Sequence, residues 1–393
     1  MSGSRPLTGA DLTGANVTRA DLTGADVTGP DVTSSQVTSR YVTARTATLR
    51  LRAMATDVTL SVAGPGSVAG PGSVAGPGSV AGPRSVAGPG SVAAALEHAG
   101  QVFGEVEAAC TRFDPDSPLM RANAAPQEWH EVPRFCFDAV AAAWQAYQET
   151  DGLFDPRVLT TLLRLGYDRS LPFRAGPVVI SSDGAATSPV AVPVRAALPV
   201  PAPRRWHPEL DAARCAVRLG PQPIDLGGIG KGLAVGLAAQ RLAGTAATYL
   251  VEAGGDCYLG GSGPQGDGWR IGVENPDPAG DGRDLVAVLR LSDAACATSS
   301  VRVRTWRVDG RPVHHLIDPR KADTAWTGLR SVTVVGPDPA WAETWSKALF
   351  LTGRAGIAEV CARRRLAALW VDEAGVVTAS PALRDRVIWQ VPA

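Results

Sequence analysis

The segment Pro223–Leu242 carries the residue pattern in this chain that is best suited to chemistry. Asp225 ends a short apolar run, and four glycines and Lys231 follow within the next seven residues. Leucines and alanines then recur at helical spacing, which predicts a helix that starts at the glycines. Backbone N–H groups at such a start can bind an anion, and the helix dipole favours one there. A tight turn without a ligand is the alternative, because glycine-rich loops alone are weak signals.

Composition excludes several functional classes. The chain has 393 residues, enough for one large domain or two smaller ones, and 38 basic residues balance 38 acidic ones. This balance predicts no nucleic-acid partner and no attraction to a membrane surface. Six scattered cysteines indicate isolated thiols rather than a zinc site or disulfides. We find no signal-peptide pattern, lipobox-like cysteine or membrane span, so we expect a cytoplasmic protein.

Two segments are of low complexity. Residues 1–46 contain five-residue copies such as ADLTG and ADVTG, which resemble pentapeptide repeats. Because so short a run has few stacked neighbours, we expect a disordered extension. Residues 61–90 repeat the hexapeptide SVAGPG, whose glycine and proline exclude a regular helix or a central strand. We interpret them as a flexible insertion inside a domain that covers residues 47–393.

Helices and strands of that domain follow one another without strict βαβ alternation, so we predict an α+β fold. Helical periodicity covers residues 93–110, 135–150 and 341–351, and Asp155-Pro156 is a typical helix start. Strand patterns cover residues 47–60, 213–219, 247–261, 269–278, 284–300, 306–319, 331–337 and the C-terminal region. Asp309-Gly310 is a hairpin signal.

The glycine-rich motif DLGGIGKG, at residues 225–232, resembles the DLGGIAKG motif of the ApbE family, the FAD:protein FMN transferases. Further segments resemble motifs of that family in the same order, from residue 47 to the C-terminus. These segments are RAMATDVTL at 52–60, RFDPDSPLMRAN at 112–123, GLFDPRV at 152–158, HLIDP at 315–319 and AETWSKALF at 342–350. Ala55 replaces the usual glycine of the first segment. The resemblance implies an ApbE-like (T-fold-like) mixed-sheet domain with packed helices.

The resemblance also implies an activity. Family members bind FAD with a divalent cation such as Mg²⁺ at its pyrophosphate. They transfer the FMN moiety to a threonine or serine hydroxyl of an acceptor flavoprotein through a phosphoester bond, and AMP leaves. By match to the motifs, the expected catalytic residues are Asp225, Lys231 and His315. The residues expected to contact the FAD are Met54, Phe113, Leu153, Phe154, Asp155, Asp225, Lys231 and Ile317.

The expected metal site departs from the family pattern. By resemblance, it comprises the backbone carbonyl of Gly228 and two side chains of the last long helix, Glu343 and Lys347. The family has aspartate and threonine at the latter two positions. Glutamate can supply an oxygen ligand, but a protonated lysine cannot. The two residues could form a simple helix-surface ion pair. Our hypothesis is that the Lys347 ammonium lies at the pyrophosphate and takes over part of the work of the cation.

Several alternatives stay open. The chain could be a non-catalytic FAD-binding protein, or an FAD pyrophosphatase that yields FMN and AMP. The Asp225 side chain could simply cap a turn, and His315, next to His314, could be a satisfied strand histidine. An NAD-binding Rossmann domain fits poorly, because the glycine spacing differs from that fingerprint.

Overall fold

The computed structural model describes residues 36–42, 46–63, 89–171, 173, 178–180, 205–277 and 284–391. Most of the expected N-terminal extension and of the insertion at 61–90 lies outside these residues. The described ends of both segments belong to regular elements. Residues 36–42 form a strand of the main sheet, residues 61–63 end another strand, and residues 89–90 begin a helix. The main sheet therefore begins before residue 47.

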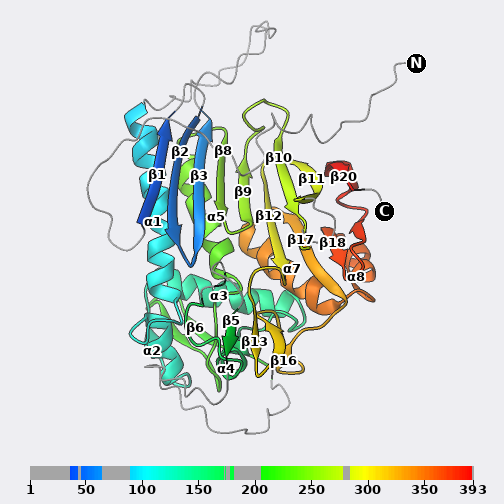
Figure 1. Cartoon of the computed structure of the whole chain (residues 1–393). Helices are drawn as coiled ribbons and strands as arrows, with labels where there is room; N and C mark the ends of the chain where they lie inside the picture. Colours follow the sequence, from blue (N-terminus) through cyan, green and yellow to red (C-terminus); the bar gives the residue numbers. More distant parts are fainter. Residues whose placement is uncertain are drawn as a thin grey trace, which may run out of the picture.

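Among the described residues, nine strands form one sheet in which every neighbouring pair is antiparallel (Figure 1). In spatial order, the strands are β1 (Gln36–Val42), β2 (Thr46–Ala53), β3 (Thr56–Ala63), β8 (Tyr249–Ala253), β9 (Asp256–Gly260), β12 (Ala294–Ser300), β17 (Leu329–Gly336), β18 (Ala367–Asp372) and β19 (Val377–Ala379). Across the sheet the strands follow the order of the sequence, and other elements are inserted between β3 and β8, β9 and β12, and β12 and β17. The sheet therefore joins the N-terminal and C-terminal parts of the chain.

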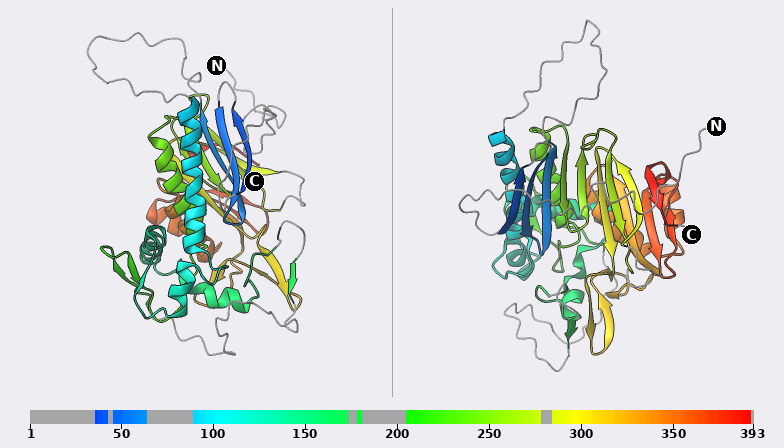
Figure 2. Two further views of the ribbon diagram at one scale, coloured as in Figure 1. Left: turned by 90° about the vertical axis from the view of Figure 1, so that its left-hand side faces the viewer. Right: turned by 45° about the horizontal axis from the view of Figure 1, so that its top comes forward.

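Long helices cover one face of this sheet. They are α1 (Pro89–Cys110), α5 (Gly230–Ala243) and α7 (Pro339–Thr352). Helix α1 packs on β2, α5 on β8 and β9, and α7 on β12 and β17. The first panel of Figure 2 shows the helices and the sheet as separate layers. Two apolar clusters, one under α1 and α5 and one under α7, fill the space between the layers. None of the described helices is long and apolar enough to cross a lipid bilayer.

A second, smaller sheet covers part of the opposite face. Its strands are β10 (Trp269–Glu274), β11 (Leu285–Leu291) and β20 (Val387–Gln390), and η3 (Arg384–Arg386) precedes the last one. Ile271 and Leu289 of this sheet share an apolar cluster with Leu259 and Val371 of the main sheet. The central strands are therefore buried on both faces.

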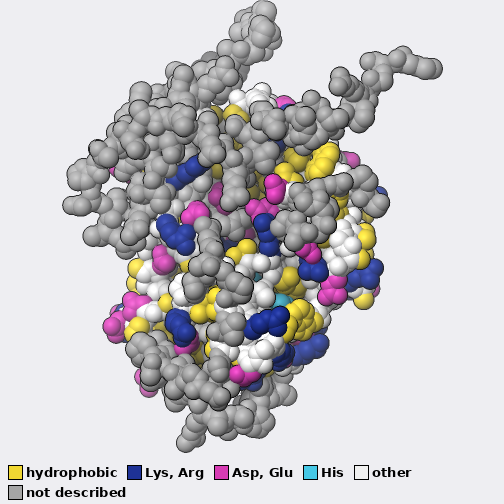
Figure 3. All heavy atoms as spheres, in the orientation of Figure 1, with side chains coloured by type: hydrophobic (Ala, Val, Ile, Leu, Met, Phe, Trp, Pro, Cys, Tyr) yellow, Lys and Arg dark blue, Asp and Glu magenta, His cyan; other side chains and the backbone are white. Residues whose placement is uncertain are grey.

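Short elements gather at one end of the main sheet, in the lower part of Figure 1. They are α2 (Pro118–Ala124), β4 (His130–Glu131), α3 (Arg134–Glu149), η2 (Pro156–Val158), α4 (Leu159–Arg164), β5 (Val178–Ile180), β6 (Glu209–Asp211), β7 (Ala216–Arg218), β13 (Thr305–Val308), β14 (Arg311–His314), β15 (Ile317–Asp318) and β16 (Asp323–Thr324). Helix α8 (Ile357–Arg364) follows α7. On the face shown in Figure 3, described acidic and basic side chains are interspersed, as the balanced composition predicts.

The α+β prediction is confirmed, and several predicted single strands are in fact hairpins. Residues 47–60 form most of the β2–β3 hairpin, because Met54 and Ala55 turn the chain with φ of +53° and +57°. Glycine adopts this left-handed conformation without strain, whereas alanine does not. The predicted strand at 247–261 likewise reverses at Gly254-Gly255 into β8 and β9. Helices α2 and α8 were not predicted.

Helices α5 and α7 cross in close contact at Gly232. A Cβ atom at this position would lie 2.6 Å from the carbonyl oxygen of Pro339 and 2.7 Å from the Cα of Ala340. Both obstacles are backbone atoms of α7, so the helices would have to move apart to admit a side chain. The glycine therefore fixes the spacing between the two helices that carry Lys231 and Glu343.

We predict that Gly232→Ala lowers the free energy of unfolding by about 2 kcal/mol, because overpacking forces a backbone shift. Gly244→Ala is the matched control, since a Cβ there meets no atom within 4 Å and its φ of −74° suits alanine. Urea denaturation of the two variants and the parent measures the difference. Equal stability of both variants would contradict the close contact.

Candidate functional site

A cavity of about 380 Å³ lies where the β2–β3 turn, the loop after α1, the start of α5 and the segment before β15 meet. Except for Glu343, the residues expected to form the site line this cavity. These lining residues are Met54, Phe113, Leu153, Phe154, Asp155, Asp225, Gly228, Lys231, His315, Ile317 and Lys347. The fold thus brings together residues that are distant in the sequence, and their individual roles stay predictions.

Aromatic side chains form one wall of the cavity. Phe113 is 37% exposed, and its ring centroid lies 5.9 Å from that of Tyr167. The Arg112 guanidinium lies 4.2 Å from the Phe113 ring centroid and 4.4 Å from the Tyr167 ring centroid. Met54 packs with its terminal methyl close to Gly230. Such a wall can stack against a flat aromatic ligand.

Asp225 lies in the cavity wall and also caps the turn that follows it. Its Oδ1 accepts a hydrogen bond of 3.0 Å from the Gly227 N–H and lies 3.7 Å from Nε of Arg112. Its own N–H donates to the carbonyl of Pro156 over 2.7 Å. The turn-capping interpretation therefore describes part of what this side chain does, and the residue also lines the cavity.

Asp155 has a different environment. Its carboxylate caps η2 through the Arg157 N–H and forms a bidentate pair with the Arg157 guanidinium, at 3.0 and 2.7 Å. Both side chains of this pair are almost fully buried. The pair fixes the loop that carries Leu153 and Phe154, so Asp155 holds the cavity wall in place.

The start of α5 binds an anion that belongs to this chain. The Gly232 N–H donates to Oε2 of Glu343 over 2.8 Å, and the Gly230 N–H donates to the Leu226 carbonyl. A carboxylate at this position also faces the positive end of the helix dipole. Glu343 therefore takes the place at the helix start that we expected a ligand to take.

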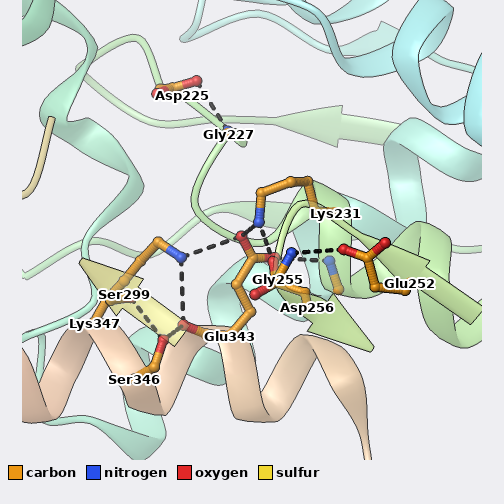
Figure 4. A network of polar contacts seen from close by, with 11 residues as sticks. Asp225, Gly227, Lys231, Glu252, Gly255, Asp256, Ser299, Glu343, Ser346 and Lys347 are labelled. Carbon is orange, nitrogen blue, oxygen red and sulfur yellow. Dashed lines mark hydrogen bonds and ion pairs between the residues drawn. The ribbon is translucent and has the colours of Figure 1, made fainter. Parts of the chain in front are cut away.

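Glu343 is the centre of a buried cluster of charges (Figure 4). Its Oε1 lies 2.9 Å from Nζ of Lys231 and 3.1 Å from Nζ of Lys347. Lys231 also bonds to the carboxylate of Asp256, which begins β9. Glu343 and Asp256 are each 1% exposed at the side chain, and the lysines are 13% and 17% exposed.

Further hydrogen bonds fix the position of Glu343 on α7. Ser346 Oγ donates to the Glu343 carbonyl over 2.9 Å and shares a hydrogen bond of 2.7 Å with Ser299 of β12. Asp256 follows a tight turn in which the Gly255 N–H donates to Glu252 over 2.9 Å. Two strands of the sheet and two helices therefore hold the cluster.

The cluster sets the ionisation of its members. Burial alone favours the neutral acid, but the ammonium groups of Lys231 and Lys347 hold the pKa of Glu343 well below its ordinary value. Although burial disfavours its charge, Lys231 has a raised pKa because Asp256 and Glu343 face it. Burial lowers the pKa of Lys347, and Glu343 partly opposes this shift. Glu343 and Lys231 are thus charged together at neutral pH.

The residues expected to bind Mg²⁺ do not fit that ion. Glu343 Oε1 accepts from two ammonium groups and Oε2 from a backbone N–H. The Lys347 methylenes lie against Gly228, where a Cβ would be 3.4 Å from Cε and 3.5 Å from Cδ. Within the described part of the chain, no group of three His, Cys, Asp or Glu side chains could hold a metal. Water and phosphate supply most of the six oxygen ligands of a protein-bound Mg²⁺, but each protein ligand needs a free lone pair. Here both Glu343 oxygens already accept hydrogen bonds, and two adjacent ammonium groups repel the ion.

The adjacent histidines have different environments. His314 is 1% exposed, accepts a hydrogen bond at Nδ1 from the Leu316 N–H and packs between Trp326 and Phe350. His315 lines the cavity, and its buried Nδ1 has no hydrogen-bond partner among the described residues. Burial, and then the nearby Arg304, His314 and Lys347, lower the pKa of His315 well below its ordinary value. His315 is therefore a neutral imidazole at the cavity.

Some residues of the cavity and the charge cluster are not predicted from the sequence. Arg112 and Tyr167 line the aromatic wall, and Arg304 lines the cavity near His315 and Lys231. Asp256 completes the charge cluster. A signal existed for Arg112, which begins one of the family-like segments, and for Asp256, an acid directly after a glycine pair. Nothing local distinguishes Arg304 from the many other arginines.

The fold and the cavity define an α+β protein with a site suited to an aromatic, anionic ligand. Comparison with known proteins makes this more specific. The chain belongs to the ApbE family, whose sequence model matches residues 54–370. A second model, for pentapeptide repeats, matches residues 7–30, which lie outside the described residues.

Relatives and solved structures agree with this assignment. The chain is 31% identical to the FAD:protein FMN transferase of Haemophilus influenzae, over 40% of this chain and 46% of that protein. It is 28% identical to the Salmonella typhimurium protein of the same name, over 67% of this chain and 72% of that protein. The ApbE protein of Thermotoga maritima has a similar fold, with a TM-score of 0.66 and 24% identity over 87% of this chain and 99% of that one.

We predict that Glu343→Gln lowers the free energy of unfolding by about 3 kcal/mol at neutral pH, because it leaves two buried ammonium groups without their shared anion. The folded-state pKa of Glu343 is depressed to about 2 from an ordinary 4.5. Its contribution to stability is therefore present above that ordinary value and is lost as the pH falls towards the folded-state value. The difference in free energy of unfolding between parent and variant should therefore shrink as the pH falls below 4.5.

Urea denaturation at neutral and at acidic pH measures both effects. Glu359→Gln is the control, because Glu359 is 80% exposed and lies 3.8 Å from Arg363 in a surface pair. Such pairs contribute little, so this variant should match the parent. A constant difference between parent and Glu343→Gln across this pH range would contradict the assigned ion pairs.

Proposed function

We propose that this protein transfers the FMN moiety of FAD to a threonine or serine hydroxyl of an acceptor flavoprotein and releases AMP. Membership of the ApbE family and the names of the curated relatives support this activity. The observation that carries the proposal is the cavity itself, in which aromatic and apolar walls adjoin Lys231, Lys347 and Arg304. A flavin matches the walls, and a pyrophosphate matches the cations.

The proposed step is attack on a phosphorus atom. The acceptor hydroxyl oxygen forms a bond to the phosphorus next to riboflavin, and the bond from that phosphorus to the bridging oxygen breaks. Its electron pair stays on the departing AMP. Such a transfer depends on positioning and on neutralising charge over the phosphates. Lys231 and Arg304 line the cavity and supply positive charge. Asp225 lies in the cavity wall, 3.7 Å from Nε of Arg112, and its carboxylate orients the ligand.

His315 is our candidate for the proton acceptor. Its imidazole lines the cavity and is neutral at physiological pH. A neutral imidazole can take the hydroxyl proton as the new bond forms, and it passes the proton to solvent once AMP has left. This assignment does not involve a metal ion.

We predict that His315→Asn lowers kcat by about 10²- to 10⁴-fold, the range expected for loss of a general base. His98→Asn is the matched control, because His98 is an exposed residue of α1. Since the pKa of His315 is lowered, the imidazole stays neutral as the pH falls below the ordinary histidine value of 6.5. The rate of transfer by the parent should therefore stay constant just below pH 6.5 and decrease only at lower pH. Equal rates for the two variants would rule out the assigned base.

The activity itself is tested with purified protein, FAD and a flavoprotein domain that has an exposed threonine. Covalent flavin on the acceptor, detected by in-gel fluorescence and mass spectrometry, is expected together with AMP. The same acceptor with that threonine replaced by alanine is the control and should stay unlabelled. AMP and FMN without labelled acceptor would instead establish an FAD pyrophosphatase. Tight FAD binding without either product would establish a binding protein.

A further inference from the structure

The chain contains only three lysines, Lys231, Lys321 and Lys347, and two of them meet in the buried cluster. Arginine supplies almost all other basic side chains. Lysine differs from arginine in that its ammonium is a compact charge with three rotatable donors. The placement of both cluster lysines against one carboxylate is therefore a feature specific to this site.

Lys347 lies between Gly228 and Glu343. Its Cδ and Cε lie within contact distance of a Cβ built on Gly228, and its Nζ lies 3.1 Å from Oε1 and 3.4 Å from the carbonyl oxygen of Glu343. Figure 4 shows the ammonium groups of Lys231 and Lys347 reaching Glu343 from different sides. Lys347 thus fills the space between the glycine loop and the α7 carboxylate.

The Lys347 ammonium also has the means to bind a ligand. Glu343 accepts two of its three N–H groups, which leaves one donor, and the side chain lines the cavity. Arg304 lines the same cavity and forms no ion pair with a described residue. Lys347 and Arg304 therefore both present positive charge to this cavity.

A purely structural ion pair explains these contacts less well. Residues at i and i+4 of a helix often pair on the surface, where they contribute little. Here Glu343 is 1% exposed and already has Lys231 as a partner. With Asp256, the cluster holds two buried carboxylates and two ammonium groups, and burying the second ammonium carries a desolvation cost. An anionic ligand that accepts from Lys347 offsets this cost.

We propose that this chain binds the diphosphate of FAD without a divalent cation, with the Lys347 ammonium donating to the phosphate oxygens and Glu343 acting as its counter-ion. The inference rests on the proposed function for the identity of the ligand. Glu343 is then a positioning residue that holds both lysines, and Lys347 is a ligand-binding residue.

The parent protein provides the first test. We strip metal with EDTA, titrate FAD and follow the quenching of flavin fluorescence, then repeat the titration with Mg²⁺. The expected Kd for FAD is the same in both buffers. A Kd that falls tenfold or more on adding Mg²⁺, equivalent to about 1.4 kcal/mol, overturns the inference.

The variant Lys347→Thr provides the second test, since it removes the ammonium and leaves Lys231 paired with Glu343. In EDTA, its Kd for FAD should rise roughly ten- to hundredfold, as expected for loss of a charge-assisted hydrogen bond. Lys321→Thr is the matched control, because Lys321 is exposed and outside the cavity, and it should match the parent. If Lys347→Thr and Lys321→Thr bind FAD equally well in EDTA, the inference is wrong.

Failure of this inference and failure of the proposed function are distinguishable. Metal-independent FAD binding without transfer to an acceptor leaves the inference standing and overturns the proposed function. Transfer that requires Mg²⁺ for FAD binding overturns only the inference. Absence of FAD binding in either buffer overturns both.

Discussion

The buried carboxylate of Glu343 is the interaction on which the rest of this site depends. It accepts from the backbone at the start of α5 and from the ammonium groups of Lys231 and Lys347. A carboxylate with 1% exposure is stable as an anion only when cations and N–H groups surround it. Glu343 therefore ties α7 to α5, and it fixes both lysines at the edge of the cavity.

This arrangement is possible because the helices approach closely. Gly232 lets the backbone of α5 lie against Pro339 and Ala340 of α7, which brings the Gly232 N–H within 2.8 Å of the glutamate. The main sheet supplies the other half of the frame, since β9 places Asp256 and β12 holds α7 through Ser299. The charge cluster is thus a product of helix packing on an antiparallel sheet.

The same packing explains why the residues expected to bind Mg²⁺ do not fit that ion. A family pattern of aspartate and threonine suits an oxygen-coordinated cation, whereas glutamate and lysine at these positions neutralise each other. The lysine side chain also lies against Gly228, whose carbonyl was the third expected ligand. A protein-bound ammonium is permanently present and does not depend on metal supply, but it cannot coordinate several oxygens at once. Lys347 therefore determines both the charge of the expected metal site and the space that is left in it.

The sequence by itself determined the fold class, the family and most residues of the cavity wall, because motifs such as DLGGIGKG encode local turns and helix starts. It also identified Glu343 and Lys347 as unusual. Only the tertiary structure decided what they do, since a carboxylate's partners depend on which helix packs beside it. Likewise, packing around β14 leaves His315 half-buried at the cavity and His314 fully buried away from it, although adjacent histidines look alike in sequence. Arg304 and Asp256 also lie at the site only because of how the chain packs, which the local sequence does not show.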